Sequence, residues 1–362
     1  MSQAEIAIGV VGVGTIGSYW LEHFAPQLSL DSQACVTALF RSTRRLEVPR
    51  GIALADWRAQ LQAQGEDYHA DSVETWVRAS CQRGQRPMVL DLTAAKSISR
   101  SYPSWLAAGA HLISANKYAG SSALDAYQEL HRVRQQYQRH WLYNTTVGAG
   151  LPILSAVNER CRCGDEIIRI EGNLSGSLSW IFQNYRSGDS LAEWIAKAQQ
   201  QGLTEPDPRL DLGGMDVARK LVILAREAGW PLQLADLEIQ NRVPETLREI
   251  ETDAFMDQGD ALDAAFDAWR ERTAPQAQQW VYLGFIERGK NGELRGGTEL
   301  KAIDESSLYA RLPAGNANFT LRSRQYDENP LVIQGPGAGP EVTAAGVHSD
   351  VLQLIARLNH HV

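Results

Sequence analysis

The most constraining feature of this 362-residue chain is an apolar run that leads directly into a glycine motif near the N-terminus. Residues 5–13 read EIAIGVVGV, which is typical of a strand buried on both faces. The motif Gly12-Val-Gly14-Thr15-Ile16-Gly17 overlaps the end of this run, and residues 18–28 have helix-like apolar spacing. A strand, G-x-G-x-x-G and a helix are together typical of a dinucleotide-binding unit, because the glycines let a pyrophosphate approach the helix N-terminus. A glycine-rich turn without a ligand is the alternative, and the context favours the ligand.

Further along the chain, short apolar runs alternate with helix-like segments. We expect strands at 35–40, 87–93 and 111–115, and helices around 56–64, 71–81 and 102–109. This alternation predicts an α/β fold with a doubly wound parallel sheet. Ligands bind such sheets beyond the carboxyl ends of the strands, which is where Thr93 and the pair Asn116-Lys117 fall. A lysine at this position either lies beside the cofactor or is an ordinary surface residue.

The end of the second expected strand indicates which cofactor the chain binds. A cofactor without a 2′-phosphate usually meets an Asp or Glu there. This sequence instead has Arg41-Ser-Thr-Arg44-Arg45. Guanidinium groups suit a 2′-phosphate through charge-assisted hydrogen bonds, so we predict that NADP(H) is preferred over NAD(H).

The composition excludes several classes of protein. The net charge is -8, which argues against a nucleic acid or an anionic membrane as partner. Of the four cysteines only Cys161 and Cys163 are close in sequence, and no zinc pattern surrounds them. The N-terminal residues lack the features of a signal peptide, and no apolar run approaches the roughly 18 residues of a membrane span. We therefore expect reduced thiols in a cytoplasmic protein with a small-molecule substrate.

The composition changes near Asn144, where a second part of the chain begins. Residues 144–152, NTTVGAGLP, are small and broken by glycines. Such a backbone either turns its carbonyls toward a cation or forms a hinge, and the hinge is the default interpretation. We expect a strand at 167–174, a turn at Ser175-Gly176-Ser177, and a helix at 180–185.

The stretch TEPDPRLDLGGMDVARK, residues 204–220, has two interpretations. Its two prolines exclude an ordinary helix interior, and we expect a loop through Gly214 and a helix from near Asp216 to Gly229. Asp216 and Lys220 are then one turn apart and form an i,i+4 pair. In one interpretation this is a capped helix beside solvated acids. In the other, carboxylates that bind a substrate amino group lie beside a lysine that moves a proton. The pattern alone leaves both open.

Five motifs, which together span nearly the whole chain, resemble the homoserine dehydrogenase family. They are SANKYAG, TVGAGLPIL, GNLSGSLSWIF, GLTEPDPRLDLGGMDVARKLVILAREAG and GPGAGPEVTAAGVHSDVLQL. The resemblance is to the dehydrogenase portion of the bifunctional aspartokinase–homoserine dehydrogenases, here standing alone. It implies a Rossmann-type NAD(P)-binding domain at 1–143, completed by a C-terminal helix in 336–362. It also implies an α+β domain at 144–335 for substrate binding and for formation of a homodimer.

The family reduces L-aspartate 4-semialdehyde to L-homoserine with NAD(P)H, reversibly, on the route to threonine, methionine and isoleucine. The resemblance implies Lys220 as proton donor and Lys117 as a second catalytic residue beside the cofactor. It implies substrate binding by Glu205, Asp216, Asp211, Ser175, Gly176 and Ser177. It implies cofactor binding by Gly12, Gly14, Thr15, Ile16, Gly17, Arg41, Thr93, Lys117, Gly337 and Gly339. It implies a Na+ or K+ site formed by the backbone carbonyls of Asn144, Val147, Ala149 and Leu151.

Four positions depart from the family pattern. Asn144 stands where a Glu is usual, Leu203 where a Tyr is usual, Leu210 where an Asp is usual, and Ser177 where a Thr is usual. The two leucines keep open a related dehydrogenase acting on another hydroxy or amino acid, and a non-catalytic NADP-binding protein is a further alternative. The sequence has no regulatory ACT domain after the last helix, so we expect weak or absent feedback inhibition by threonine.

Overall fold

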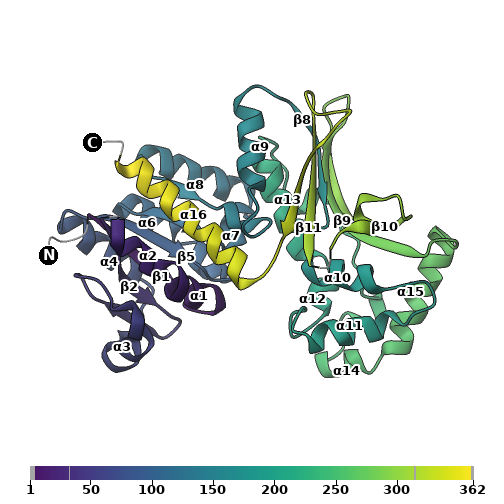
Figure 1. Cartoon of the computed structure of the whole chain (residues 1–362), viewed down its shortest axis with the longest axis horizontal. Helices are drawn as coiled ribbons and strands as arrows, with labels where there is room; N and C mark the ends of the chain where they lie inside the picture. The colour runs from purple at the N-terminus through teal and green to yellow at the C-terminus, as the bar shows by residue number, and fades with distance from the viewer. Residues whose placement is uncertain (1–4, 32, 314, 360–362) are drawn as a thin grey trace. The chain divides into compact units, whose positions relative to one another are not determined.

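The computed structural model describes residues 5–31, 33–313 and 315–359 (Figure 1). The chain divides into two compact units. The N-terminal unit consists of residues 1–150 and 339–362, and the central unit of residues 151–338. Among the described residues, no helix combines the length and apolar character needed to cross a membrane. Cys35, Cys81, Cys161 and Cys163 form no disulfide bond in the structure.

The N-terminal unit has a seven-stranded sheet in the order β4-β3-β2-β1-β5-β6-β7. The strands are β1 (Ile6–Val11), β2 (Ala34–Phe40), β3 (Arg44–Glu47), β4 (Glu66–Asp67), β5 (Arg86–Asp91), β6 (His111–Ser114) and β7 (Trp141–Leu142). The five strands from β2 to β7 in this order are parallel, and β3 and β4 add an antiparallel edge. The predicted α/β fold with a parallel sheet is therefore confirmed.

Helices cover both faces of this sheet. They are α1 (Thr15–His23), α2 (Ala25–Asp31), α3 (Trp57–Gln64), α4 (Ser72–Gln82), α5 (Lys96–Ser99), α6 (Tyr102–Ala108), α7 (Lys117–Gly120), α8 (Leu124–Gln136) and α16 (Pro340–Asn359), with the short 3-10 helices η1 (Leu54–Asp56) and η2 (Asn144–Thr146). Alternate residues of β1 enter two separate cores, which explains its continuous apolar run. One core contains α1 and α16, and the other contains α4, α6 and α8. Figure 1 shows α16, in yellow, lying along α1.

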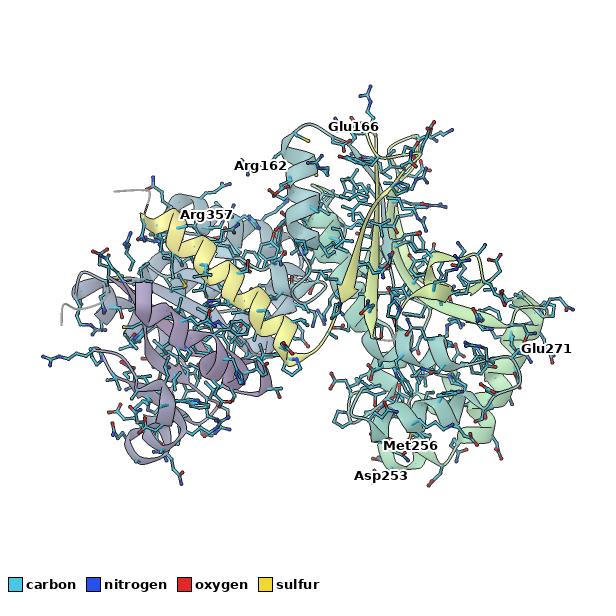
Figure 2. The ribbon with its side chains drawn as sticks, viewed as in Figure 1. Arg162, Glu166, Asp253, Met256, Glu271 and Arg357 are labelled. Carbon is cyan, nitrogen blue, oxygen red and sulfur yellow. The ribbon has the colours of Figure 1, made fainter. Side chains whose placement is uncertain are left out.

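The central unit has a five-stranded antiparallel sheet in the order β10-β9-β8-β11-β12. Its strands are β8 (Ile167–Gly172), β9 (Gln279–Arg288), β10 (Leu294–Ile303), β11 (Asn316–Ser323) and β12 (Leu331–Pro336). Its helices are α9 (Ile153–Arg162), α10 (Gly176–Asn184), α11 (Leu191–Gln200), α12 (Arg209–Leu212), α13 (Met215–Glu227), α14 (Thr252–Met256) and α15 (Gly259–Thr273), with the 3-10 helices η3 (Leu234–Asp236), η4 (Glu245–Leu247) and η5 (Leu308–Arg311). Figure 2 labels Arg162 at the end of α9 and Glu166 before β8, on the two sides of the turn that joins them.

Helix α13 packs closely against the central sheet because β9 has a glycine at the contact. A Cβ atom at Gly284 would lie 2.8 Å from the side chains of both Leu174 and Val217. Val217 and Leu221 are fully or almost fully buried there, and burying each such side chain contributes roughly 1.5–3 kcal/mol. The helix that carries Lys220 is therefore held firmly on the sheet.

The prediction of a continuous loop through Gly214 was wrong at one segment. Residues 209–212 form the single turn α12, with Pro208 as its N-cap residue in a helical conformation. A proline is compatible with a helix start, since its missing N–H would have no partner there. Gly214, with a φ of 71°, is the N-cap residue of α13, so Asp216 lies in the first turn of α13 and complements the helix dipole without capping the helix.

A buried histidine makes the stability of the N-terminal unit sensitive to acid. His111 at the start of β6 is 3% exposed, and its Nδ1 accepts a hydrogen bond from the His140 N–H at 3.1 Å. Burial, assisted by the nearby cations Arg139 and Arg86, lowers the His111 pKa to about 3. In the unfolded chain the histidine keeps its ordinary pKa of 6.5, so the unfolded chain binds the proton first as the pH falls. This contribution to stability is complete above pH 6.5 and is lost as the pH falls toward 3.

We expect a His111→Gln variant to lose this pH dependence. Between about pH 6.5 and pH 4 the wild-type protein should lose about 3 kcal/mol of unfolding free energy that the variant does not lose. Glutamine keeps an acceptor for the His140 N–H but has no proton to take up. Urea unfolding of both proteins at several pH values, followed by circular dichroism, measures the difference. Parallel pH profiles would contradict the assignment to His111.

Candidate active site

The glycine loop between β1 and α1 has a geometry suited to a pyrophosphate. Gly12 has a φ of 90°, and a Cβ at Gly17 would lie 2.2 Å from the Gly12 carbonyl oxygen, so both positions require glycine. A Cβ at Gly14 would meet no atom within 4 Å and would project into open space. The Ser18 N–H donates to the Gly14 carbonyl at 2.8 Å, which leaves the preceding N–H groups without an intrahelical acceptor. These residues fit a phosphate at the helix N-terminus.

The three arginines after β2 have different surroundings. Arg45 forms ion pairs with Glu47 and Glu66, both at 2.9 Å, and Arg44 donates to the Gly65 carbonyl. Arg41 is exposed, and its guanidinium forms no ion pair within the described part of the chain. Arg41 is therefore the arginine available for a phosphate group.

A buried carboxylate organises the carboxyl ends of β5 and β6. Asp91 is 1% exposed and accepts four hydrogen bonds, from the Thr93 N–H, the Thr93 hydroxyl, the Tyr102 hydroxyl and the Asn116 amide, at 2.7–2.9 Å. Burial raises the pKa of Asp91, and these hydrogen bonds oppose the rise. Asn116 also caps α7 by accepting from the Tyr118 N–H at 3.0 Å. Helix α7 begins at Lys117, so this network fixes the backbone that carries Lys117 and the Thr93 loop.

In the central unit, Lys220 is held by two partners. Its Nζ donates to the Leu174 carbonyl at 2.7 Å and lies 2.8 Å from a carboxylate oxygen of Asp216. The predicted i,i+4 pair is therefore present. The Lys220 side chain is 14% exposed and that of Asp216 is 53% exposed, so the pair lies at the surface of the unit. An ammonium has three N–H donors, and these contacts leave one for a further ligand.

The loop before α13 is attached to the start of α10 through Asp211. The Ser177 hydroxyl donates to one carboxylate oxygen of Asp211 at 2.6 Å, and the Glu205 N–H donates to the other at 2.9 Å. The hydroxyls of Ser175 and Ser177 lie 3.1 Å apart, and Ser175 caps α10 by accepting from the Leu178 N–H at 3.2 Å. Burial raises the pKa of Asp211, and the Ser177 hydrogen bond opposes the rise. The backbone of Glu205 is thereby fixed.

The carboxylates of this loop thus have distinct surroundings. Asp207 forms an ion pair with Arg209 at 2.8 Å, which lowers the Asp207 pKa, and Arg209 also donates to the Ile250 carbonyl at 2.5 Å. Asp207 therefore anchors the loop. The Glu205 side chain is exposed and makes no hydrogen bond or ion pair with any residue that the structure describes. Glu205 is thus the loop carboxylate available to a ligand.

Residues 144–151 form a strained turn that suits backbone ligation. Gly148 and Ala149 both have positive φ values, 77° and 54°. The Asn144 N–H donates to the buried Asp350 carboxylate of α16 at 3.2 Å, and the hydroxyl of Thr145, itself 6% exposed, has no hydrogen-bond partner among the described residues. Asp350 thus brings a carboxylate to the start of this loop. Across residues 5–31, 33–313 and 315–359, no three His, Cys, Asp or Glu side chains are grouped as a metal site, so an ion here would depend on the carbonyls.

The remaining predicted cofactor residues follow β12. A Cβ at Gly337 would lie 2.3 Å from that of Ala317, so close packing already requires glycine there. Gly339 has a φ of 118° and directly precedes α16. The predicted site residues are divided between the two units. Their individual roles stay predictions.

Sequence reasoning missed Asp91 and Asp350, two buried acids that accept hydrogen bonds from the predicted site residues Thr93 and Asn144. Asp91 ends an apolar strand and precedes Thr93, a position at which a carboxylate can bond the next loop. That signal was present in the sequence. Asp350 gave no such signal, because its partner lies about 200 residues away, at Asn144.

The two halves of the chain match two models of one family. Residues 12–144 match the model described as homoserine dehydrogenase, NAD binding domain, and residues 152–352 match the model described as homoserine dehydrogenase. The chain belongs to the homoserine dehydrogenase family. The predicted family resemblance is thus confirmed.

Known proteins of this family resemble the chain over nearly its full length. Bifunctional aspartokinase/homoserine dehydrogenase 2 of Escherichia coli is 38% identical over 97% of this chain. Homoserine dehydrogenase of Emericella nidulans is 33% identical over 98% of this chain and 100% of that protein. The chain spans 39–44% of the length of the bifunctional relatives. The fold resembles a hyperthermophilic archaeal homoserine dehydrogenase solved with NADPH, with a TM-score of 0.71, 19% identity and coverage of 96% of each chain.

Proposed function

We propose that the protein is an NAD(P)H-dependent homoserine dehydrogenase that interconverts L-aspartate 4-semialdehyde and L-homoserine. The observation that carries this proposal is Lys220, which the Leu174 carbonyl and Asp216 orient while one of its N–H donors stays available. It occurs in a chain of the homoserine dehydrogenase family. The reaction belongs to the biosynthesis of threonine, methionine and isoleucine.

Each step on the protein side has a residue suited to it. The glycine loop would hold a reduced nicotinamide cofactor, which when bound would supply a hydride for the carbonyl carbon of the substrate. Lys220 donates a proton to the carbonyl oxygen, and in the reverse direction it accepts the hydroxyl proton. Lys117, on the backbone that the Asp91 network fixes, orients the reacting groups. Glu205 binds the substrate ammonium together with Asp216. Asp211 was predicted as a substrate ligand. Its contacts with Ser177 and with the Glu205 N–H also give Asp211 the role of positioning Glu205.

We further propose NADP(H) as the preferred cofactor, bound by the glycine loop and by Arg41. Replacing Arg41 with alanine should raise the KM for NADPH by about 10- to 100-fold and leave the KM for NADH unchanged, because only NADPH has a 2′-phosphate for the guanidinium. Initial rates with both cofactors measure this. Arg45→Ala is the matched control, because its guanidinium is already paired with Glu47 and Glu66. An equal effect of Arg41→Ala on both cofactors would contradict the role.

A monovalent cation at 144–151 and a homodimer complete the proposal. The positive φ values of the loop and the nearby Asp350 carboxylate support the cation. The exposed Val332 on the edge strand β12, 44% accessible, supports a contact through the central sheet. The cytoplasmic location stays a prediction.

A related dehydrogenase is the second candidate, and the exposure of two departing residues favours it. Leu203, before Glu205, is 41% exposed, and Leu210, beside Asp211 in α12, is 60% exposed, so both present apolar surface. Reduction of NADP+ by homoserine and by a panel of other hydroxy acids, followed by nicotinamide absorbance, distinguishes the candidates. Homoserine should give the highest kcat/KM. A higher value for another acid would favour the related dehydrogenase, and no turnover with any acid would indicate a non-catalytic binding protein.

A further inference from the structure

A basic cavity lies at the amino ends of the parallel strands, whereas the glycine loop follows the carboxyl end of β1. It has a volume of about 720 Å3 and is lined by Arg86, His111, Arg134, Arg139 and His140, with neutral residues completing it. Arg86 begins β5, His111 begins β6, and His140 directly precedes β7, so the cavity lies at the amino ends of these strands. The predicted cofactor residues Thr93 and Lys117 follow the carboxyl ends of β5 and β6. The two ends of β5, which has six residues, are separated by roughly 17 Å.

The positive charge of this cavity is only partly compensated. Arg86 pairs with Glu5 at 3.0 Å and donates to the Leu358 carbonyl at 2.6 Å. Arg134 and Arg139 form no ion pair with any residue that the structure describes, and the Nε of Arg139 is buried without a hydrogen-bond partner. No acidic side chain is among the described residues that line the cavity. The chain as a whole carries a net charge of -8, so the cavity concentrates positive charge, of which only that of Arg86 is paired with a carboxylate among the described residues.

The two histidines that line the cavity, His111 and His140, add to its capacity to bind an anion. The Nδ1 of His111 accepts the His140 N–H, so the neutral imidazole carries its proton on Nε2 and is a donor. The two imidazole rings are stacked with centroids 5.3 Å apart. Arg139 and Arg86, after burial itself, are among the causes that lower the His111 pKa. The cavity thus offers N–H donors and a positive potential, which an oxyanion satisfies.

We propose that this cavity binds a small metabolite through a phosphate group, with Arg134 and Arg139 as its principal ligands. A phosphate monoester brings about two negative charges and several acceptor oxygens, which match two guanidinium groups and the His111 donor. The volume falls in the range of roughly 300–1,000 Å3 of small-molecule sites and leaves room for more than the phosphate itself. The site is separate from the cofactor loop and from the residues proposed for the reaction.

Isothermal titration calorimetry with pyrophosphate tests the proposal. The full-length chain is first saturated with NADPH, so that the cofactor loop does not contribute, and ionic strength is held constant with chloride. The wild-type protein should bind pyrophosphate, and Arg134→Gln/Arg139→Gln should weaken binding by at least about tenfold. Arg357→Gln is the matched control. Arg357, labelled near the end of α16 in Figure 2, does not line the cavity and should leave the affinity unchanged.

Three results would overturn the proposal: no binding to the wild-type protein, equal binding by the double variant, or an equal loss in Arg357→Gln. Circular dichroism and NADPH affinity of the variants establish whether they are folded. If the double variant does not fold, hydrogen exchange of the wild-type protein decides. Pyrophosphate should then slow exchange in residues 134–140, and unchanged exchange there would also overturn the proposal. Because neither arginine belongs to the proposed reaction, failure here leaves the proposed dehydrogenase activity unaffected.

Discussion

Replacing Lys220 with alanine should lower the turnover number for homoserine oxidation by about a thousandfold, with little change in the affinity for NADP(H). A positioned general acid–base contributes roughly 10²–10⁴-fold to a rate, and Lys220 is the proposed donor. The variant should fold, because its partner Asp216 is 53% exposed and is not left as a buried unpaired charge. Steady-state rates and fluorescence titration with NADPH give the two quantities.

Two further variants separate catalysis from structure. Lys220→Arg keeps a cation that can reach Asp216 and the Leu174 carbonyl, but a guanidinium does not give up its proton, so its turnover should stay low. Lys197→Ala removes a comparable i,i+4 lysine, paired with Glu193 at 3.7 Å on α11, and should be fully active. Recovery of turnover by arginine would show that Lys220 acts only through its charge and its contacts.

Replacing Glu205 with glutamine should raise the KM for homoserine by about 30- to 100-fold while changing the turnover number much less. In the proposed site the variant would lose a charge-assisted bond to the substrate ammonium, which is worth roughly 1.5–3 kcal/mol. Glutamine has nearly the same shape, and the Glu205 backbone stays bonded to Asp211 through its N–H. Initial rates over a range of homoserine concentrations measure the effect, and Glu193→Gln, an exposed acid on α11, is the control.

A hydroxy acid that lacks the amino group sharpens this test. The wild-type enzyme should use it poorly, and Glu205→Gln should cause no further loss, because the contact is already absent. If Glu205→Gln weakened both substrates equally, the carboxylate would be acting on the loop and not on the ammonium.

Much of the N-terminal unit could be predicted from the sequence because its signals are local. Residues 6–11, IAIGVV, carry no polar side chain, as expected for a strand buried between two cores, and they form β1 within the predicted 5–13. The strand and helix predicted around 111–115 and 102–109 agree with β6 and α6 in the same way. The short strand β3, next to the edge strand β4, was not predicted, since only Leu46 of its sequence RRLE is buried.

The central sheet was harder to predict because its pattern depends on contacts between distant segments. The hairpin β9–β10 contains glycines at 284, 296 and 297, which weaken a strand prediction from sequence. In the structure a Cβ at Gly297 would lie 2.2 Å from the Glu238 carbonyl oxygen, so the glycine is required by a neighbour that the local sequence does not reveal.

In the candidate site, too, local contacts could be predicted from the sequence and contacts between distant segments could not. Asp216 and Lys220 could be paired from helix geometry alone, and the structure has the pair at 2.8 Å. The distinction between Glu205, Asp207 and Asp211 could not be drawn from sequence. It depends on Arg209 beside Asp207 and on Ser177, 34 residues before Asp211, which only the folded chain brings to its carboxylate.

Transfer of a labelled hydrogen tests the central claim most directly. Aspartate 4-semialdehyde is incubated with the purified chain and with NADPH that carries deuterium at its transferable position, and the product is analysed by mass spectrometry and nuclear magnetic resonance. The account predicts homoserine with one deuterium on the carbon that bears the hydroxyl group, and a greatly reduced amount with Lys220→Ala. Absence of deuterated homoserine from the wild-type reaction would contradict it.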